Sequence, residues 1–149
     1  DRRYVESGLD NVIIRNAVSY QCEVCKTDYR SIEGMEGLHR AIAQTIARGH
    51  SKLSNKEVRF LRKYLGYSNR DFAKLLNMTE YQTSRWQSDD RPEEISPTAE
   101  RFLRFLVLAE HEPCTDYMRK DLMESGLEKT RAPDMHIERS NGSWLSFAD

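Results

Sequence analysis

Residues 69–86 constrain the fold of this chain most strongly, because they have the pattern of two short helices joined by a tight turn. Ala73 is small enough for two helices to cross closely, and Leu75 and Leu76 supply the apolar face of the first helix. Asn77 stands at the turn, where the backbone must be left-handed and Asn is tolerated next after Gly. These features predict a pair of crossed helices.

The second helix of this pair, predicted over residues 79–88, has a polar side and an inward side. Thr79 can cap its start, and Gln82 three residues later completes a capping box. Thr83 and Trp86 are spaced to face inward. The outward side chains can form hydrogen bonds with base edges: Glu80, Tyr81, Gln82, Ser84 and Arg85. The pattern predicts a helix-turn-helix, whose second helix enters the major groove of DNA.

The flanking sequence contains further helix starts. Ser54 and Glu57 form another capping box, Ser68 can cap the first helix of the pair, and Ser96 precedes Pro97 in the same way. Four helix starts therefore fall in order within about 45 residues, which predicts a small helical bundle around the helix-turn-helix. The alternative is a helical bundle with no role in DNA binding.

Charge is distributed unevenly along the 149 residues. The net charge is -1. Residues 52–88, however, contain eight Lys and Arg side chains against three Asp and Glu. A local basic surface suits a DNA-binding protein, because phosphate contacts supply much of the affinity. The alternative is an ordinary solvated helix face.

The first 32 residues differ in character, with short strands predicted at 2–5, 12–14 and 18–21. A piece this small usually needs a metal or a disulfide for stability. Cys22 and Cys25 have the spacing of half a zinc site, which would need two further ligands. The remaining Cys114 is distant in sequence. The two missing zinc ligands could come from an upstream pair. The alternatives to a zinc site are free thiols or a redox pair.

The other segments connect and extend these parts. Residues 34–49 predict an amphipathic connecting helix, followed by a hinge. Residues 97–111 are apolar on more than one side, which indicates either a dimer contact or a larger monomer core. A further helix is predicted at 115–124, and Asn141-Gly142 predicts a hairpin over 135–147. The aromatic side chains of that hairpin need a surface, either the N-terminal sheet or a second subunit.

The expected fold is therefore mainly α. It would have a small zinc-finger-like β domain at 1–32, a connecting helix and hinge at 33–52, a helix-turn-helix domain at 53–111, and an extension at 112–149 with a helix and a β-hairpin. No enzyme motif and no apolar run long enough for a membrane span is present, so we expect neither an enzyme nor a membrane protein. The absence of a signal peptide predicts a cytoplasmic protein.

The order of motifs resembles a known family, the two-domain antitoxins and repressors of the MqsA type, with an N-terminal zinc finger and a C-terminal Xre/Cro-like, lambda-repressor-like helix-turn-helix. The resemblance covers about residues 1–111 and rests on four stretches: Tyr4 to Val12, Cys22 to Cys25, Leu53 to Lys63, and Ser84-Arg85-Trp86. It implies a homodimer that binds a palindromic operator, often its own promoter, and in several relatives the neutralisation of a toxin. The family's upstream Cys-x-x-Cys is absent from this chain, Lys26 stands where the family has Gly, and the tail after Glu112 is longer.

We therefore expect a dimeric, autoregulatory repressor that binds double-stranded DNA. Arg85 should read a guanine, and the phosphate contacts should come from Asn69, Lys74, Thr79 and Ser88. The alternative is an antitoxin whose N-terminal domain neutralises a cognate toxin, with DNA binding as autoregulation. A zinc-dependent interaction module with the helix-turn-helix as scaffold is a third class.

Overall fold

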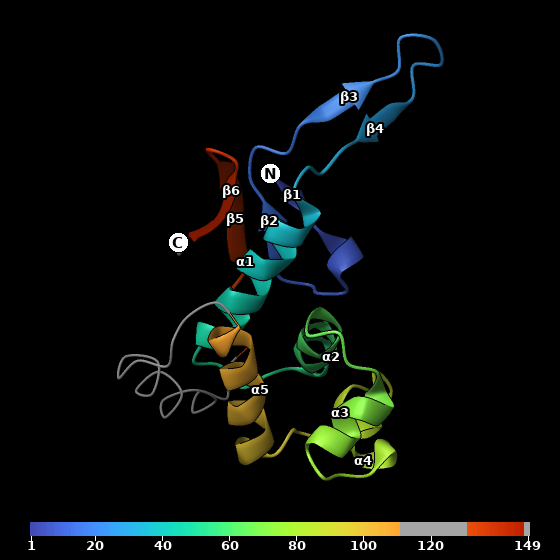
Figure 1. The fold of residues 1–149 in the computed structure, drawn as a ribbon. Helices are drawn as coiled ribbons and strands as arrows, with labels where there is room; N and C mark the ends of the chain where they lie inside the picture. Colours follow the sequence, from blue (N-terminus) through green and yellow to red (C-terminus); the bar gives the residue numbers. More distant parts are fainter. Residues whose placement is uncertain (111–130, 148–149) are drawn as a thin grey trace. The chain divides into compact units, whose positions relative to one another are not determined.

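The computed structural model describes residues 1–110 and 131–147, which form two compact units (Figure 1). The first unit combines Asp1–Ile42 with Asp134–Asp149, and the second is Ala43–Pro133. Among the described residues no helix has the length and apolar character needed to cross a membrane. The predicted helix at 115–124 lies outside the described residues.

The fold is mixed α/β, which confirms the expected helices, N-terminal strands and C-terminal hairpin but differs from a mainly α protein. The described residues contain five α-helices, one short 3-10 helix, one four-stranded mixed sheet and one separate two-stranded sheet. The reason for the difference is that the C-terminal hairpin joins the N-terminal strands in one sheet, whereas the sequence showed these only as small isolated pieces.

The first unit is built on the four-stranded sheet, in the order β1-β2-β5-β6. Its strands are β1 (Arg2–Arg3), β2 (Val12–Ile14), β5 (Met135–Ser140) and β6 (Ser143–Phe147). Strand β5 pairs with β2 in parallel, whereas β1–β2 and β5–β6 are antiparallel. Figure 1 shows the C-terminal hairpin, in red, beside β2. The hairpin therefore uses the N-terminal sheet, one of the two surfaces considered for it.

Local sequence explains these strands. The alternation of Val12, Ile13 and Ile14 gives buried, half-buried and buried side chains, as a one-sided sheet requires. Asn141 and Gly142 both have positive φ, at 49° and 78°, which confirms the two-residue hairpin turn. Strand β1 is shorter than predicted, because Val5–Ser7 form a 3-10 helix, η1.

A second hairpin in the first unit consists of β3 (Ser19–Gln21) and β4 (Asp28–Arg30). Only β3 was expected, because Asp28-Tyr29-Arg30 is too short and too polar to stand out as a strand. The rings of Tyr20 and Tyr29 stack across this pair with their centroids 6.1 Å apart.

Helix α1 (Met35–Arg48) begins in the first unit and ends in the second, and it confirms the predicted connecting helix. Leu38 and Ile42 lie one turn apart on it and are fully buried. Near its start, Trp144 of β6 donates a hydrogen bond from Nε1 to the carbonyl oxygen of Gly34 at 2.9 Å. The C-terminal hairpin is thereby fixed to the entry of this helix.

The second unit contains α2 (Asn55–Tyr64), α3 (Asn69–Leu75), α4 (Glu80–Trp86) and α5 (Pro97–Ala109). All four N-caps are the predicted residues, Ser54, Ser68, Thr79 and Ser96, and each side chain accepts from the backbone N–H three residues on. The core comes from every helix and includes Leu61, Phe72, Trp86, Leu103 and Val107.

One expectation for the core of this unit was wrong. Leu75 is 38% exposed, Leu76 is half-buried at the C-cap, and Phe72 and Ala73 form the inner face of α3. The seven-residue helix is too short to bury residues on more than one turn. On α5, Phe102 is 37% exposed and Phe105 is half-buried, so both a dimer contact and a larger core stay open for that face.

Candidate nucleic-acid interface

Helices α3 and α4 are joined by a turn of four residues whose geometry follows from Asn77. This residue has φ of 53°, the left-handed conformation predicted for it. The N–H of Met78 donates to the carbonyl oxygen of Ala73 at 2.9 Å, which ends α3 and reverses the chain. Thr79 and Gln82 then form the predicted capping box at the start of α4. Local sequence therefore ends α3, reverses the chain and starts α4.

Asn69, at the start of α3, locks the two helices together. Its Nδ2 donates to the carbonyl oxygen of Glu80 at 3.2 Å and to Oγ of Ser84 at 2.9 Å. Its Oδ1 accepts from the Thr83 hydroxyl and from Nε2 of Gln87, both at 3.0 Å. These four bonds use both donors and both acceptor positions of the amide.

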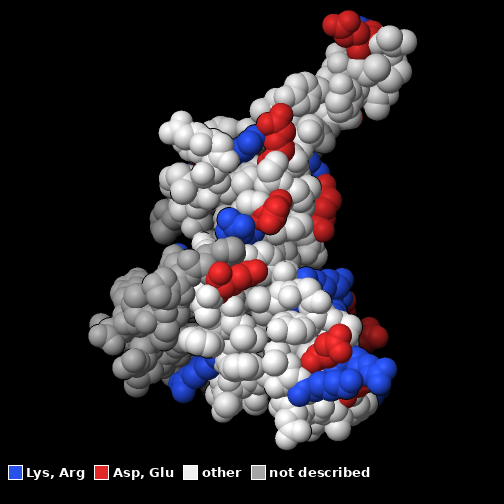
Figure 2. Space-filling model, in the orientation of Figure 1, with Lys and Arg blue, Asp and Glu red and all other residues white. Residues whose placement is uncertain are grey.

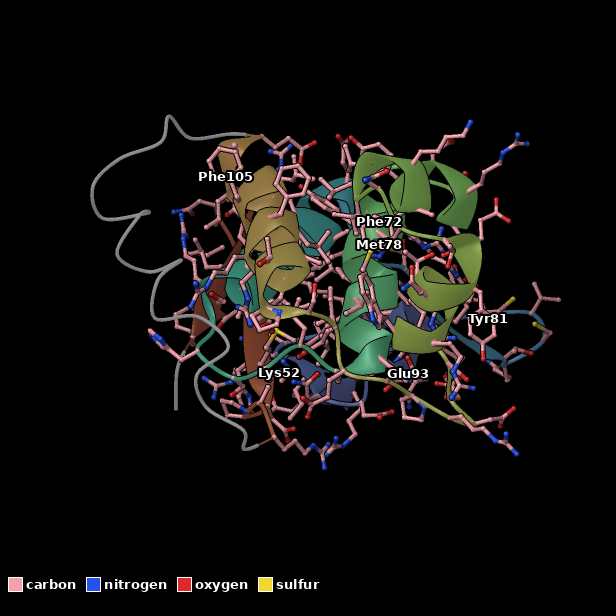
Figure 3. The ribbon with its side chains drawn as sticks, turned by 90° about the horizontal axis from the view of Figure 1, so that it is seen from below. Lys52, Phe72, Met78, Tyr81, Glu93 and Phe105 are labelled. Atoms are coloured by element: carbon pink, nitrogen blue, oxygen red, sulfur yellow. The ribbon has the colours of Figure 1, made fainter. Side chains whose placement is uncertain are left out.

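The inner face of α4 is formed by Thr83, Trp86 and Gln87, which are 0%, 5% and 8% exposed. On the outer face, Tyr81 is 70% exposed, and Gln82 and Ser84 are also exposed. Figure 3 shows Tyr81 pointing away from the core, whereas Phe72 and Met78 point into it. The burial of Thr83 and Trp86 confirms the predicted orientation of the helix.

The predicted base-reading residues lie together on this outer side but differ in how they are held. Oε1 of Gln82 accepts from the Thr79 backbone N–H at 3.0 Å, so its amide nitrogen remains available for a donor role. Oγ of Ser84 is bonded to Asn69. Glu80 is exposed in the first turn, near the helix N-terminus. Near the start of the helix, the Gln82 amide nitrogen and the Tyr81 hydroxyl are therefore the polar groups most available to bond with DNA.

Arg85 is the most constrained of the predicted base readers. Its Nε donates to Oε1 of Glu93 at 3.2 Å, and its guanidinium carbon lies 6.0 Å from the ring centroid of Tyr81. Glu93 belongs to the loop after α4, and sequence reasoning did not include it in the site. The only signal for it was an acidic cluster at 89–94, which is ordinary for a loop.

The predicted phosphate-binding residues are not equivalent. Lys74 and Thr79 are exposed, at the end of α3 and the start of α4. The Ser88 hydroxyl accepts from the backbone N–H of Arg91 at 3.3 Å. The Asn69 side chain is occupied within the protein, so a phosphate could not bind its amide without breaking one of the four bonds described above.

Ion pairs reduce the basic excess of the second unit. Arg59 contacts Asp89, Lys52 contacts Glu94, and Arg85 contacts Glu93. The hydrogen bond from Arg59 holds the pKa of Asp89 below its usual value. Lys63, Arg70 and Lys74 are exposed and form no ion pair within the described parts of the chain. Figure 2 shows Lys and Arg side chains gathered with a few acidic ones over α3.

Cys22 and Cys25 lie at the tip of the β3–β4 hairpin as free thiols. The Lys26 N–H donates to the Cys22 carbonyl oxygen at 3.0 Å, and Lys26 has φ of 58°, the conformation that Gly would adopt most easily. Hydrogen bonds, chiefly from the Thr27 side chain, lower the pKa of Cys25 to about 7. A tetrahedral zinc ion needs four ligands, and the described residues bring no group of three or more His, Cys, Asp or Glu together.

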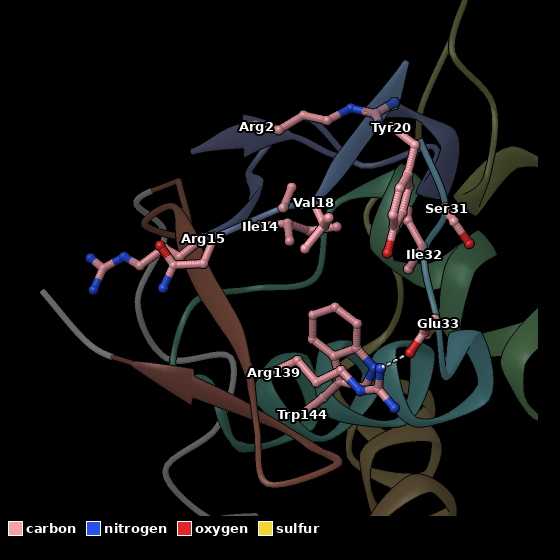
Figure 4. Close-up of a pocket in the computed structure, with 12 residues that line it drawn as sticks. Arg2, Ile14, Arg15, Val18, Tyr20, Ser31, Ile32, Glu33, Arg139 and Trp144 are labelled. Carbon is pink, nitrogen blue, oxygen red and sulfur yellow. Dashed lines mark hydrogen bonds and ion pairs between the residues drawn. The ribbon is translucent and has the colours of Figure 1, made fainter. Parts of the chain in front are cut away.

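The first unit also contains a cavity of about 130 Å³, roughly the space of one amino-acid side chain (Figure 4). Apolar and aromatic side chains line much of it, among them Val18, Tyr20, Ile32 and Trp144. At its rim, Nη1 of Arg139 contacts Oε2 of Glu33 at 2.6 Å. Tyr20 and Val18 are also 46% and 57% exposed, so apolar surface continues outside the cavity.

No protein-family model, no curated protein and no solved structure matches this chain. The family resemblance of the sequence therefore stays a prediction.

Proposed function

We propose that this chain is a dimeric, sequence-specific DNA-binding repressor that reads a palindromic operator with α4 and represses its own promoter. The observation that carries the proposal is the outer face of α4. Tyr81, Gln82 and Ser84 are exposed there, on a helix whose inner face is buried and whose start is fixed by a capping box. An exposed polar helix face on a rigid support is what direct readout in the major groove requires.

The second support is the joint between α3 and α4. Base readout needs side chains held in a fixed geometry, and the four hydrogen bonds of Asn69 provide this without using an exposed group of α4 other than Ser84. The exposed cations Arg70 and Lys74 on the adjacent helix supply charge for phosphate contacts. Under this proposal the second unit is a lambda-repressor-like domain.

The test is binding of the purified protein to its own upstream region and to random DNA across a salt series. We expect affinity for both to fall with salt, and the preference for the upstream DNA to persist. Arg85→Ala should weaken upstream binding by about 1–3 kcal/mol. Arg40→Ala, which removes an exposed arginine from α1, is the matched control and should change little. Equal and steeply salt-dependent binding to both DNAs would refute sequence-specific repression.

A second candidate function is an antitoxin that binds a toxin through the first unit. The observation that favours it is the apolar cavity next to the exposed side chains of Val18 and Tyr20. Co-purification with the product of an adjacent small gene, lost in Tyr20→Ser and kept in Arg40→Ala, would support this function. If the wild-type protein does not co-purify with that product, the antitoxin function is refuted.

Zinc remains a proposed structural ligand, with Cys22 and Cys25 as two of its four donors. The turn at Lys26 favours this, because it places the two thiols in one exposed loop. The other two donors would have to come from outside the described residues. Native mass spectrometry of the wild type and of Cys25→Ser would measure whether a zinc ion depends on this pair.

A further inference from the structure

The side chain of Arg85 is held by a residue from outside α4. Its Nε contacts Oε1 of Glu93, and the backbone N–H of Glu93 donates to the carbonyl oxygen of Arg85 at 3.1 Å. Two separate bonds therefore join the same two residues, one through side chains and one through the main chain. The main-chain bond fixes the loop next to Arg85, so the position of the Glu93 carboxylate does not depend on the side-chain contact alone.

The loop that carries Glu93 is fixed at both ends. At its start, Oδ1 of Asp89 accepts from Arg59 and from Asn55, each at 2.9 Å. At its end, Ile95 is 2% exposed, and its carbonyl oxygen accepts from Nζ of Lys52 at 3.2 Å. Glu93 is thus held on a supported segment.

This contact selects which part of the guanidinium is presented to solvent. Nε is bonded to Glu93, and Tyr81 flanks the group on the same face of α4. The two terminal nitrogens of Arg85 have no hydrogen-bond partner within the described part of the chain. Two adjacent N–H donors match the N7 and O6 acceptors of a guanine in the major groove.

We propose that Glu93 is a positioning residue that orients Arg85 to read guanine. The inference rests on the proposed function, because it assigns a role within the same DNA interface. The carboxylate bonds Nε and reduces the freedom of the long side chain before DNA binds, so that less entropy is lost on binding.

A purely structural role is a poor explanation for this pair. Glu93 and Arg85 have 55% and 25% of their side-chain surfaces exposed. Exposed ion pairs contribute little to stability, typically about 0–1 kcal/mol. Removal of the carboxylate should therefore leave the unfolding midpoint nearly unchanged, and an effect on base preference can be separated from an effect on folding.

The experiment selects bound sequences from a pool of random-sequence DNA duplexes with four proteins: the wild type, Glu93→Ala, Glu93→Gln and Glu94→Ala. Glu94 is the matched control, because it is the adjacent acid and contacts Lys52 at 3.7 Å instead of Arg85. Glu93→Gln keeps an oxygen that can accept from Nε. Thermal unfolding of each variant establishes that it is folded.

We expect the wild type to select a motif with one strongly preferred guanine per half-site. Glu93→Ala should lower the preference for that guanine by about tenfold, with the other positions unchanged. Glu93→Gln should restore most of the preference, and Glu94→Ala should behave as the wild type.

Three results would overturn the inference. In the first, Glu93→Ala keeps the full guanine preference. In the second, it binds all sequences more tightly with the same preference, which would make Glu93 only a charge that repels phosphate. In the third, the effect does not follow the contact with Nε, because Glu94→Ala loses as much preference as Glu93→Ala or Glu93→Gln loses as much as Glu93→Ala. If the wild type itself selects no motif, the proposed function fails instead.

Discussion

Arg104 is a fully buried arginine at the centre of the second unit. Its guanidinium donates to four main-chain carbonyl oxygens, those of Ile46, Ala47, Gly49 and Ser51. The first two are at the end of α1, where a helix leaves its last carbonyl groups without partners. Its charge is balanced by Glu100, 3.4 Å away. The residue thus supplies hydrogen bonds to buried backbone carbonyl groups at the end of α1 and in the segment that follows it.

Replacement of Arg104 should therefore be costly. Arg104→Met preserves much of the apolar volume but takes the guanidinium away from several buried carbonyl groups and from Glu100, whose charge is then balanced only by its hydrogen bond from the Leu53 N–H within the described residues. We expect a loss of about 3–5 kcal/mol in the free energy of unfolding, measured with urea at pH 7. Arg101→Met on the exposed side of α5 is the control and should cost less than about 1 kcal/mol. A loss for Arg104→Met as small as that of the control would mean that water can replace the guanidinium.

Glu57 gives a prediction about pH. It is 5% exposed, and burial raises its pKa above 4.5, against the hydrogen bonds from Ser54 that lower it. A carboxyl group whose pKa is higher in the folded state binds its proton more tightly there, so it favours folding below pH 4.5 and this contribution is lost as pH rises through the raised pKa.

Glu57→Gln should therefore gain stability relative to the wild type as pH rises above about 4.5. Gln can also complete the capping box, as Gln82 does at the start of α4. Urea unfolding of both proteins from pH 4 to pH 8 measures the difference. If the difference in the free energy of unfolding between Glu57→Gln and the wild type is the same at every pH, titration of Glu57 does not contribute to stability.

At the scale of elements, the joint of α3 and α4 depends on Asn69. Asn69→Ala removes all four hydrogen bonds of the amide, although the Thr83 hydroxyl keeps the Glu80 carbonyl oxygen and Nε2 of Gln87 keeps the Thr83 carbonyl oxygen as partners. We expect a loss of about 1–3 kcal/mol in the free energy of unfolding. Arg70→Ala, at the next position on the same helix, should cost almost nothing.

Asn69→Ala and a second variant of the same residue, Asn69→Asp, test whether Asn69 contacts phosphate. Asn69→Asp keeps the acceptor Oδ1 but replaces the donor Nδ2 with an oxygen. If the amide serves only the joint, a folded Asn69→Asp variant should therefore retain part of the stability. A variant that weakens DNA binding with no loss of stability would instead support the phosphate contact. Circular dichroism and fluorescence anisotropy on the same samples separate the two.

The elements of the second unit could be predicted because their determinants are local. A cap such as Ser68, a turn residue such as Asn77 and a capping box such as Thr79 with Gln82 each act within four residues. The parallel pairing of β2 with β5 joins positions more than 120 residues apart, and nothing near either strand specifies it. For the same reason the contact between Arg85 and Glu93 was missed, since it depends on the path of a loop.

For the whole molecule, the two units differ in how they are connected along the chain. The first is discontinuous, since β5 and β6 return to it after the second unit. Its core includes Ile14 and Ile137, whereas that of the second includes Leu61 and Leu103. Each unit also contains one of the two tryptophans, Trp144 in the first and Trp86 in the second. Separate cores predict separate unfolding, and the tryptophans can report on it.

Ile137→Asp tests this independence. Ile137 is fully buried in β5, and an unpaired carboxylate there should cost several kcal/mol, enough to unfold the first unit. Fluorescence of Trp144, followed in a Trp86→Phe background, should then lack a folded signal. Fluorescence of Trp86, in a Trp144→Phe background, should keep its cooperative urea transition, and operator binding should persist because α4 lies in the second unit. The control is Leu145→Asp in the same hairpin. The Leu145 side chain is 48% exposed, so this substitution should leave both fluorescence signals intact. Simultaneous loss of both tryptophan transitions in Ile137→Asp would mean that the units fold as one, and that the C-terminal hairpin is required for the DNA-binding unit as well.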